Sequence, residues 1–244
     1  MESMAVILPA AGRSTRFVNS ARTAAGRVEV HPATLKKPFI DLCGKPIWFR
    51  SISPFLRRAD VAQIVIAVSP EDLEWFRTRF ANELANARIQ VVAGGTERAD
   101  TVEAALRIIP QSVELIAVHD AARPLIRDDT IEAVVQAARR TGAAIPATAI
   151  SSTIKRVDPA QLISETVSRA GLWAAQTPQI VRQDWLRRAF AERGSFQPTD
   201  EAQLIEHLGL PVEVVTGWAS NLKITTQDDL DLAEALLSLT ATAD

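Results

Sequence analysis

Short apolar runs alternate with amphipathic stretches along nearly all of the 244 residues of this chain. The apolar runs have the length of buried strands, whereas the stretches between them repeat their apolar positions at helical spacing. The predicted strands span residues 5–8, 63–68, 89–92, 114–118, 143–149, 173–176, 212–215 and 222–224. The predicted helices span residues 46–58, 71–84, 99–109, 129–140, 182–192, 199–208 and 227–237. This alternation predicts crossover βαβ units, and therefore an α/β fold with a mostly parallel, twisted sheet and helices on both of its faces.

Two segments interrupt the alternation. Residues 18–35 show neither a strand nor a helix period and are rich in small, polar and turn-forming side chains, which predicts a long inserted loop. In residues 151–171, short alternating runs flank an Asp158-Pro159 turn, which predicts a two-stranded β-arm that projects from the sheet. Because so small an arm does not bury a core of its own, we expect it to pack against a second subunit. We expect residues 1–244, with these two segments, to form one domain.

The composition limits the classes of function that the chain can serve. Its 27 basic and 29 acidic side chains nearly balance, which argues against a nucleic-acid or membrane-surface binder but leaves small anionic ligands open. Cys43 is the only cysteine, so an intramolecular disulfide and a multi-cysteine zinc site are excluded, and a reducing compartment suits the chain. The three histidines are too widely separated to predict a histidine metal cage. Since no apolar run reaches membrane-spanning length and no signal peptide is recognisable, we expect a cytoplasmic protein with no membrane partner.

The start of the chain carries the first chemical signal. An apolar run over residues 4–8 ends at Pro9 and is followed by small residues, Gly12 and two arginines, Arg13 and Arg16. Small side chains let backbone N–H groups approach phosphate oxygens, and arginine supplies a fixed positive charge with several donors. The loop has the pattern of neither a dinucleotide-binding fold nor a P-loop. On its own it fits either a polyanion-binding loop or an ordinary turn from a strand into a helix.

A second group of polar residues follows the predicted strand 114–118, and ligands of open α/β sheets bind at such strand ends. Asp120 suits the orientation of a hydroxyl or the binding of Mg²⁺, and Arg123 suits a phosphate. A local ion pair between these two residues is the structural alternative. His119 is interpreted as a packed or hydrogen-bonded core residue and not as a general base.

Two weaker signals lie elsewhere in the chain. Gly94 and Gly95 leave the backbone bare for the approach of a base or ribose, and Thr101 is expected to begin the next helix. Lys223 lies in a short predicted strand just before a helix, a place where a lysine is usually a solvated charge.

Taken together, these segments resemble the 2-C-methyl-D-erythritol 4-phosphate cytidylyltransferase family of the non-mevalonate isoprenoid pathway. The matching residues occur in the family's order over nearly the whole chain, and the element from His119 to Pro124 is specific. The matches are Pro9 to Gly12 with Arg16; Lys37 before Phe39; Gly94 and Gly95 with Glu97, Arg98, Ala99 and Asp100; His119 to Pro124; Thr153 to Arg156; Arg169 to Trp173; Thr177 to Gln179; Thr199 to Ala202; and Asn221 to Lys223.

The resemblance implies a homodimeric, Rossmann-like nucleotidyltransferase. Such an enzyme joins CTP to a polyol phosphate, 2-C-methyl-D-erythritol 4-phosphate, and gives 4-diphosphocytidyl-2-C-methyl-D-erythritol and pyrophosphate. Four residues carry the implied catalytic roles: Arg16 and Lys37 stabilise the transition state, and Arg169 and Lys223 position the acceptor phosphate. The implied CTP pocket consists of Ala10, Ala11, Gly12, Gly95, Arg98, Thr101 and Asp120. The implied contacts to the acceptor come from Asp120, Arg123, Thr153, Arg169, Thr199 and Lys223, some of them across the dimer through the arm.

The chemistry of this reaction agrees with the scarcity of histidine. A phosphate monoester is already an anion near neutral pH, so its attack on the α-phosphorus needs no strong general base. The barrier lies in bringing two polyanions together, and fixed Arg and Lys side chains lower it together with Mg²⁺ on the triphosphate oxygens. We therefore expect a Mg²⁺ cofactor that is held mainly by the CTP phosphates, with Asp120 as a candidate protein ligand.

The chain departs from the family pattern at two places. Ser14 stands where the glycine-rich loop often has a second glycine, and the segment 17–36 is longer than expected before the catalytic lysine. Phe39 and Ile40 follow at the expected offset, which favours Lys37 over Lys36 as that lysine. The insertion 18–35 fits either a lid that closes over the triphosphate, an altered choice of acceptor, or a solvated excursion without a role.

Two other functions stay open at this point. A ribitol-5-phosphate cytidylyltransferase uses a closely similar acceptor, and only a few contacts to the polyol decide between the two activities. A nucleotide-binding paralogue without turnover is the other alternative. The presence of all five residues Arg16, Lys37, Asp120, Arg169 and Lys223 argues against it.

Overall fold

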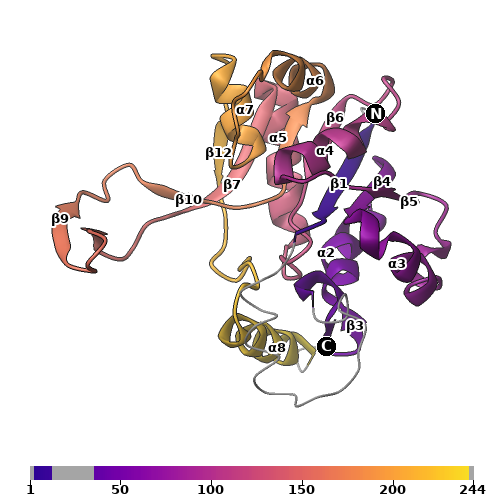
Figure 1. The fold of residues 1–244 in the computed structure, drawn as a ribbon, viewed down its shortest axis with the longest axis horizontal. Helices are drawn as coiled ribbons and strands as arrows, with labels where there is room; N and C mark the ends of the chain where they lie inside the picture. Colours follow the sequence, from indigo (N-terminus) through magenta and orange to yellow (C-terminus); the bar gives the residue numbers. More distant parts are fainter. Residues whose placement is uncertain (1–2, 13–35, 242–244) are drawn as a thin grey trace.

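The computed structural model describes residues 3–12 and 36–241. Its centre is one eight-stranded sheet with the order β10-β7-β11-β6-β1-β4-β5, and β12 also pairs with β7 (Figure 1). The strands are β1 (Met4–Ala10), β4 (Val61–Val68), β5 (Ile89–Ala93), β6 (Leu115–Val118), β7 (Ala143–Ala149), β10 (Trp173–Ala175), β11 (Gln179–Arg182) and β12 (Glu213–Thr216). β1 is parallel to β4 and β6, β4 to β5, and β7 to β12, whereas β10 and β11 are antiparallel to their neighbours. The predicted mostly parallel sheet is confirmed.

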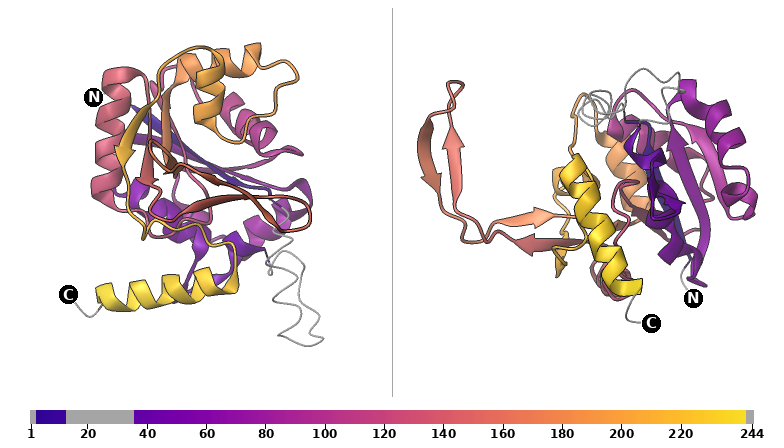
Figure 2. Two further views of the ribbon diagram at one scale, coloured as in Figure 1. Left: turned by 90° about the vertical axis from the view of Figure 1, so that its left-hand side faces the viewer. Right: turned by 90° about the horizontal axis from the view of Figure 1, so that it is seen from below.

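Helices cover both faces of the sheet because β1 is apolar on both sides (Figure 2). Val6 and Leu8 face one cluster of buried side chains, which includes Trp48 of α2, whereas Ile7 faces a second cluster, which includes Val102 of α4. The α-helices are α2 (Ile47–Leu56), α3 (Leu73–Arg79), α4 (Arg98–Arg107), α5 (Asp128–Thr141), α6 (Gln183–Glu192), α7 (Glu201–His207) and α8 (Gln227–Ala241). The 3-10 helices are η2 (Lys37–Phe39), η3 (Pro70–Asp72) and η4 (Glu83–Ala85). The predicted two-sided arrangement is confirmed.

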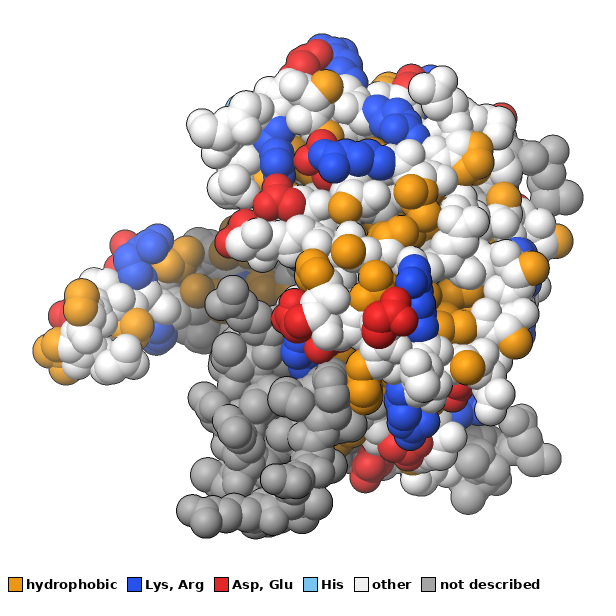
Figure 3. Space-filling view, turned by 45° about the vertical axis from the view of Figure 1, so that its right-hand side comes forward, with side chains coloured by type: hydrophobic (Ala, Val, Ile, Leu, Met, Phe, Trp, Pro, Cys, Tyr) orange, Lys and Arg blue, Asp and Glu red, His pale blue; other side chains and the backbone are white. Residues whose placement is uncertain are grey.

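The predicted arm is present as an antiparallel hairpin that projects away from the body of the molecule (Figures 1 and 2). Its strands, β8 (Ile154–Val157) and β9 (Ile163–Val167), form a separate two-stranded sheet. Apolar side chains lie exposed near its tip (Figure 3), where Leu162 and Ile163 are 66% and 64% exposed. A second small hairpin, β2 (Asp41–Leu42) with β3 (Lys45–Pro46), packs against α8 through Leu42.

Two sequence-based assignments are wrong, and one strand of the central sheet was not predicted. Residues 222–224 do not form a strand: Ile224 donates its N–H to the carbonyl of Ala122 and is buried beside α8, so its apolar pattern reflects packing and not sheet pairing. The strand β11 was not predicted, because only four residues separate Pro178 from α6. The predicted helix 71–84 is divided into η3, α3 and η4, and α3 ends at Arg79 because Phe80 leaves the helical conformation.

Several features lie outside the described residues. They are Arg16, Ser14 and the insertion 18–35. Within the described part of the chain, no helix is both long and apolar enough to cross a membrane.

Candidate active site

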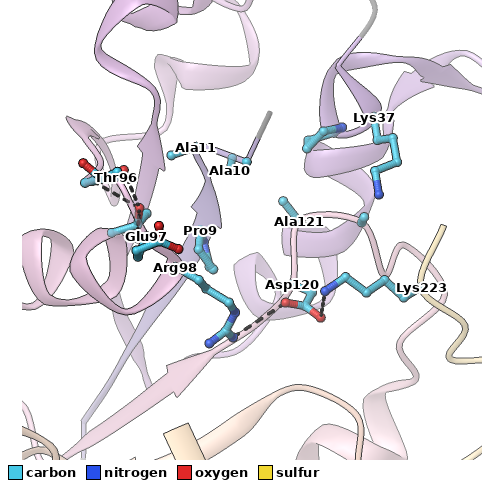
Figure 4. A pocket seen from close by; sticks show the side chains of 15 residues that line it. Pro9, Ala10, Ala11, Lys37, Thr96, Glu97, Arg98, Asp120, Ala121 and Lys223 are labelled. Carbon is cyan, nitrogen blue, oxygen red and sulfur yellow. Dashed lines mark hydrogen bonds and ion pairs between the residues drawn. The ribbon is translucent and has the colours of Figure 1, made fainter. Parts of the chain in front are cut away.

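A cleft of about 300 Å³ lies at the carboxyl ends of β1 and β6, beside the loop that joins β5 to α4. Among the described residues, three cations (Lys37, Arg98 and Lys223) and two carboxylates (Glu97 and Asp120) line it (Figure 4). The other lining residues are uncharged and mostly small: Pro9, Ala10, Ala11, Gly12, Pro38, Gly95, Thr96, Thr101, Ala121 and Ala122. All the residues that the resemblance implied for the CTP pocket therefore lie in one cleft, at the edge where ligands bind in open α/β sheets.

The loops after β1 and β5 pack closely because Gly94 and Gly95 lack side chains. A Cβ atom on Gly94 would lie 2.8 Å from Cβ of Ala11, and one on Gly95 would lie 2.5 Å from Cβ of Asp100. Contacts this short are repulsive, so the paired glycines are required for the backbone to approach so closely.

The helix α4 begins earlier than the sequence predicted. Arg98 is its first residue, and Glu97 and Asp100 form a reciprocal capping box. Thr101 therefore lies inside the helix, and the expectation that it begins a helix is wrong. Its hydroxyl accepts a hydrogen bond from the N–H of Gly95 at 3.1 Å, which holds the glycine loop against the helix.

Asp120 is the electrostatic centre of the cleft. Its carboxylate accepts hydrogen bonds from Lys223 Nζ at 2.9 Å and from Arg123 Nε at 3.3 Å, and Arg98 Nη2 lies 3.6 Å away. Burial by itself raises the pKa of Asp120, but the charges of Lys223, Arg98 and Arg123 outweigh burial and hold the pKa well below its usual range. Asp120 is therefore ionised near neutral pH. The local ion pair with Arg123 is present, as one part of this larger cluster.

Arg98 reaches Asp120 from a buried ion pair of its own. Its two terminal nitrogens donate to the carboxylate oxygens of Glu201 at 2.6 and 3.0 Å, and the Glu201 side chain is 1% exposed. Burial lowers the pKa of Arg98, but Glu201 and Asp120 outweigh burial and raise it. Glu201 belongs to the motif from Thr199 to Ala202, yet its pairing partner lies 103 positions away in the chain, so no local pattern indicated it.

His119 is a structural residue, as the sequence analysis interpreted it. Its side chain is fully buried, and its two ring nitrogens lie 3.0 Å from Thr177 Oγ1 and 3.1 Å from the carbonyl of Arg123. Burial lowers the pKa of His119 to about 4. The ring is therefore neutral near pH 7 and joins the loop that carries Asp120 to the segment that carries Thr177.

The two adjacent lysines have different surroundings. Lys37 lines the cleft, and Figure 4 shows its side chain entering from the side opposite Glu97 and Arg98. Lys36 instead forms an ion pair with Asp72 and donates to Ser69 Oγ at 3.0 Å, outside the lining of the cleft. This difference supports the sequence-based choice of Lys37.

Lys223 enters the cleft from an irregular segment that is held by Arg123. Arg123 donates from Nη1 to the carbonyl of Asn221 at 2.7 Å, and Asn221 donates from Nδ2 to the carbonyl of Thr177 at 3.0 Å. Arg123 does not line the cleft and, within this chain, supports the segment that carries Lys223.

Three predicted residues that the structure describes, Thr153, Arg169 and Thr199, do not reach the cleft within one chain. Thr153 is exposed beside the arm, and Arg169 follows β9 and donates to the carbonyl of Ser151. Thr199 lines a separate depression of about 310 Å³ that also contains Trp173 of β10. Within one chain, these predicted site residues therefore lie apart from the cleft.

Comparisons with known proteins identify the family. The family model described as 2-C-methyl-D-erythritol 4-phosphate cytidylyltransferase matches residues 4–239. The chain belongs to this family. Relatives of that name from Rhodopirellula baltica and Solibacter usitatus are 40% and 41% identical to the chain, over 97% and 96% of its length and 95% of theirs. A crystal structure of the cytidylyltransferase of that name from Thermus thermophilus matches with a TM-score of 0.75 at 29% identity, covering 97% of this chain and 98% of that one.

Membership of the cytidylyltransferase family confirms the resemblance and the α/β nucleotidyltransferase fold. The protein is therefore an enzyme, a nucleotidyltransferase of the non-mevalonate pathway of isoprenoid synthesis. The relatives reported above carry the methylerythritol name, so the ribitol alternative is not favoured.

Proposed function

We propose that this cleft catalyses the transfer of a cytidylyl group from CTP to 2-C-methyl-D-erythritol 4-phosphate. One observation carries the proposal: Lys37, Arg98 and Lys223 line the same cleft as the glycine- and alanine-containing loops at the carboxyl edge of the sheet. Small residues leave backbone N–H groups accessible to phosphate oxygens, and the three cations suit a triphosphate and an acceptor phosphate held together.

The reaction is an in-line displacement at phosphorus. A phosphate oxygen of the acceptor forms a bond to the α-phosphorus of CTP, and the bond from that phosphorus to the bridging oxygen of the β-phosphate breaks. The bonding electrons leave with pyrophosphate. The attacking oxygen is already anionic, so no residue has to remove a proton, and the neutral His119 is not needed as a base. Catalysis is then electrostatic and consists in holding cations where negative charge increases.

The proposed roles follow from position. Lys37 faces the transferring phosphoryl group, and Arg16 is assigned to the same task by family resemblance. Lys223 is held by Asp120 and positions the acceptor phosphate. Arg98 anchors Asp120 and contacts the nucleotide. The Asp120 carboxylate is also suitably placed for a hydroxyl of either substrate.

The donor set of the cleft suits a Mg²⁺ ion that binds together with CTP. Among the described residues there is no group of three or more His, Cys, Asp or Glu side chains that could hold a metal ion. Of the two carboxylates that the described residues place in the cleft, Glu97 caps α4, so Asp120 is the candidate protein ligand. Mg²⁺ prefers oxygen ligands and keeps several from water or phosphate, so most of its ligands would come from the triphosphate. When bound, the ion neutralises phosphate charge.

The first prediction concerns substrate choice. Purified protein with CTP and Mg²⁺ should release pyrophosphate when 2-C-methyl-D-erythritol 4-phosphate is added. With ribitol 5-phosphate, kcat/KM should be about 10- to 100-fold lower, because a few differing contacts to the polyol discriminate by that order. A coupled assay of pyrophosphate release measures both. Turnover with ribitol 5-phosphate alone would contradict the choice of acceptor, and turnover with neither would favour a binding protein.

We further propose that the enzyme is a homodimer in which the arm of each subunit completes the partner's cleft. The arm projects from the body and exposes Val157, Leu162 and Ile163 by 48%, 66% and 64%, more than a solvated hairpin of this size would favour. The arm also carries Arg169, which the family resemblance assigns to the acceptor phosphate. A cytoplasmic location is proposed from the exposed free thiol of Cys43, which suits a reducing compartment.

The second prediction tests this shared site by mixing inactive variants. Lys37→Ala damages the cleft and Arg169→Ala damages the arm, so a mixed dimer would keep one intact site made of the undamaged halves. Equal mixing after subunit exchange should therefore restore about a quarter of the wild-type activity, because about half of the dimers are mixed and each has one intact site. A mixture of Lys37→Ala with Lys223→Ala is the matched control and should restore nothing, because both residues belong to the cleft. Mixed dimers without restored activity, or a fully active monomer in sedimentation, would contradict the proposal.

A further inference from the structure

Lys36 and Asp72 form a buried ion pair directly beside the cleft. The Lys36 side chain is 11% exposed and that of Asp72 is 3% exposed. Ser69 Oγ lies between them, because it accepts from Lys36 Nζ at 3.0 Å and donates to the Asp72 carboxylate. Glu71 adds a longer contact to Lys36 at 3.5 Å. The positive charge of Lys36 is therefore neutralised outside the cleft.

The carboxylate of this ion pair, Asp72, lies in a segment that is fixed to the end of β4. Ser69 follows β4 directly, and Asp72 ends η3 one turn later. The last residue of β4, Val68, pairs with Ala10, the last residue of β1. The ion pair thus stands next to the strand end that carries the small-residue loop of the cleft.

The chain is anchored again just after Lys37. Phe39 is 6% exposed, and its ring packs against the rings of Trp75 and Phe76 with centroids 5.5 and 5.2 Å apart. Its N–H donates to the carbonyl of Lys36 at 2.9 Å, which closes a tight turn around Lys37 and Pro38. Lys37 therefore lies between a buried ion pair on one side and a buried aromatic ring on the other.

A buried ion pair is weak evidence of stabilisation, because the cost of removing both charges from water offsets most of their attraction. A fixed backbone at a reacting cation has a clearer use, since a displacement of about 1 Å at a distance from the chemistry can lower a rate by about 100-fold. Binding Lys36 outside the cleft also prevents this neighbouring cation from competing with Lys37 for the triphosphate.

We propose that Asp72 is a positioning residue for the transfer reaction, which holds Lys36 out of the cleft and thereby fixes Lys37 within it. The inference rests on the proposed function of Lys37. It assigns to Asp72, Ser69 and Lys36 a role in turnover without contact to either substrate.

The test compares Asp72→Asn with Asp60→Asn. Asp60 is the matched control because it precedes β4 at the opposite end, is similarly buried at 6% exposure, and pairs with Arg58 at 2.7 Å. Both variants should lower the melting temperature. Only Asp72→Asn should lower kcat, by about 10- to 100-fold, with KM for CTP changed by less than about threefold, because positioning acts on the transition state more than on binding.

Three further variants extend the test, and two of them, Lys36→Met and Ser69→Ala, keep it informative if Asp72→Asn does not fold. Lys36→Met should lower kcat to a similar extent, and Lys36→Met combined with Asp72→Asn should be no worse than either alone, since both remove one interaction. Ser69→Ala keeps both charges and should lower kcat by a smaller factor.

The outcomes separate this inference from the proposed function. The inference is overturned if kcat of Asp72→Asn stays within about twofold of wild type. If Asp72→Asn does not fold, the same result for both Lys36→Met and Ser69→Ala overturns it. An equal loss of kcat in Asp60→Asn would overturn it as well, because the effect would then belong to general stability. If Lys37→Ala itself retains turnover, that result contradicts the proposed function of Lys37, on which the inference about Asp72 rests.

Discussion

Lys37→Ala should lower kcat by about 100- to 1,000-fold, equivalent to about 2.7–4 kcal/mol of transition-state stabilisation, which is the usual cost of deleting one preorganised donor at a developing charge. The physical reason is that Lys37 is one of three cations that line the cleft in the described part of the chain, and it approaches from the side opposite Arg98. Steady-state kinetics with saturating CTP and acceptor measures the loss. The melting temperature should stay close to that of wild type, because the neighbouring Pro38 and Phe39 supply the packing of this segment.

The matched control for this variant is Lys45→Ala. Lys45 is an exposed lysine of β3 that does not line the cleft, so its removal changes the net charge equally without affecting turnover. Near-wild-type turnover of Lys37→Ala would show that the assignment of the catalytic lysine across the 18–35 insertion is wrong.

The parallel core of the fold was predictable because a strand that is buried on both faces has a continuous apolar run in its sequence. β1 and β4 are apolar at almost every position, and a turn signal marks the end of each, Pro9 one residue before the end of β1 and Ser69-Pro70 directly after β4. Residues 222–224 show the limit of this reasoning. Leu222 and Ile224 have the same local pattern as a short strand, but Ile224 is buried and Leu222 half-buried in the cluster beside α8, and neither belongs to a sheet.

The cleft was predictable where its residues come from contiguous motifs at strand ends. Ala10 to Gly12, Gly95 and Asp120 lie in such motifs, and parallel strands bring their carboxyl ends to one edge. Glu201 and Asp72 could not be found in this way. Each is defined by a partner that the fold supplies, Arg98 for one and Lys36 for the other, and no local pattern encodes a tertiary ion pair.

Glu201→Ala is expected to lower the free energy of unfolding by about 3 kcal/mol, the lower end of the range for breaking a buried ion pair. The Glu201 side chain is 1% exposed and binds Arg98 through both carboxylate oxygens. Its removal leaves the guanidinium without its main counter-charge. The lower end applies because Arg98 keeps 28% exposure to the cleft and the carboxylate of Asp120 at 3.6 Å. Equilibrium denaturation in urea at pH 7 measures the change.

Glu192→Ala is the matched control for this prediction, because Glu192 also pairs with an arginine, Arg188, at 2.8 Å but with both side chains more than half exposed. Solvent screens such a surface pair, so its loss should cost less than about 1 kcal/mol. Glu201→Gln should fall between the two, since the amide still accepts one hydrogen bond from Arg98 but carries no charge. If Glu201→Ala were no less stable than Glu192→Ala, Arg98 would have to be held by Asp120 alone. The Glu201 carboxylate would then not be what holds Arg98 in the cleft.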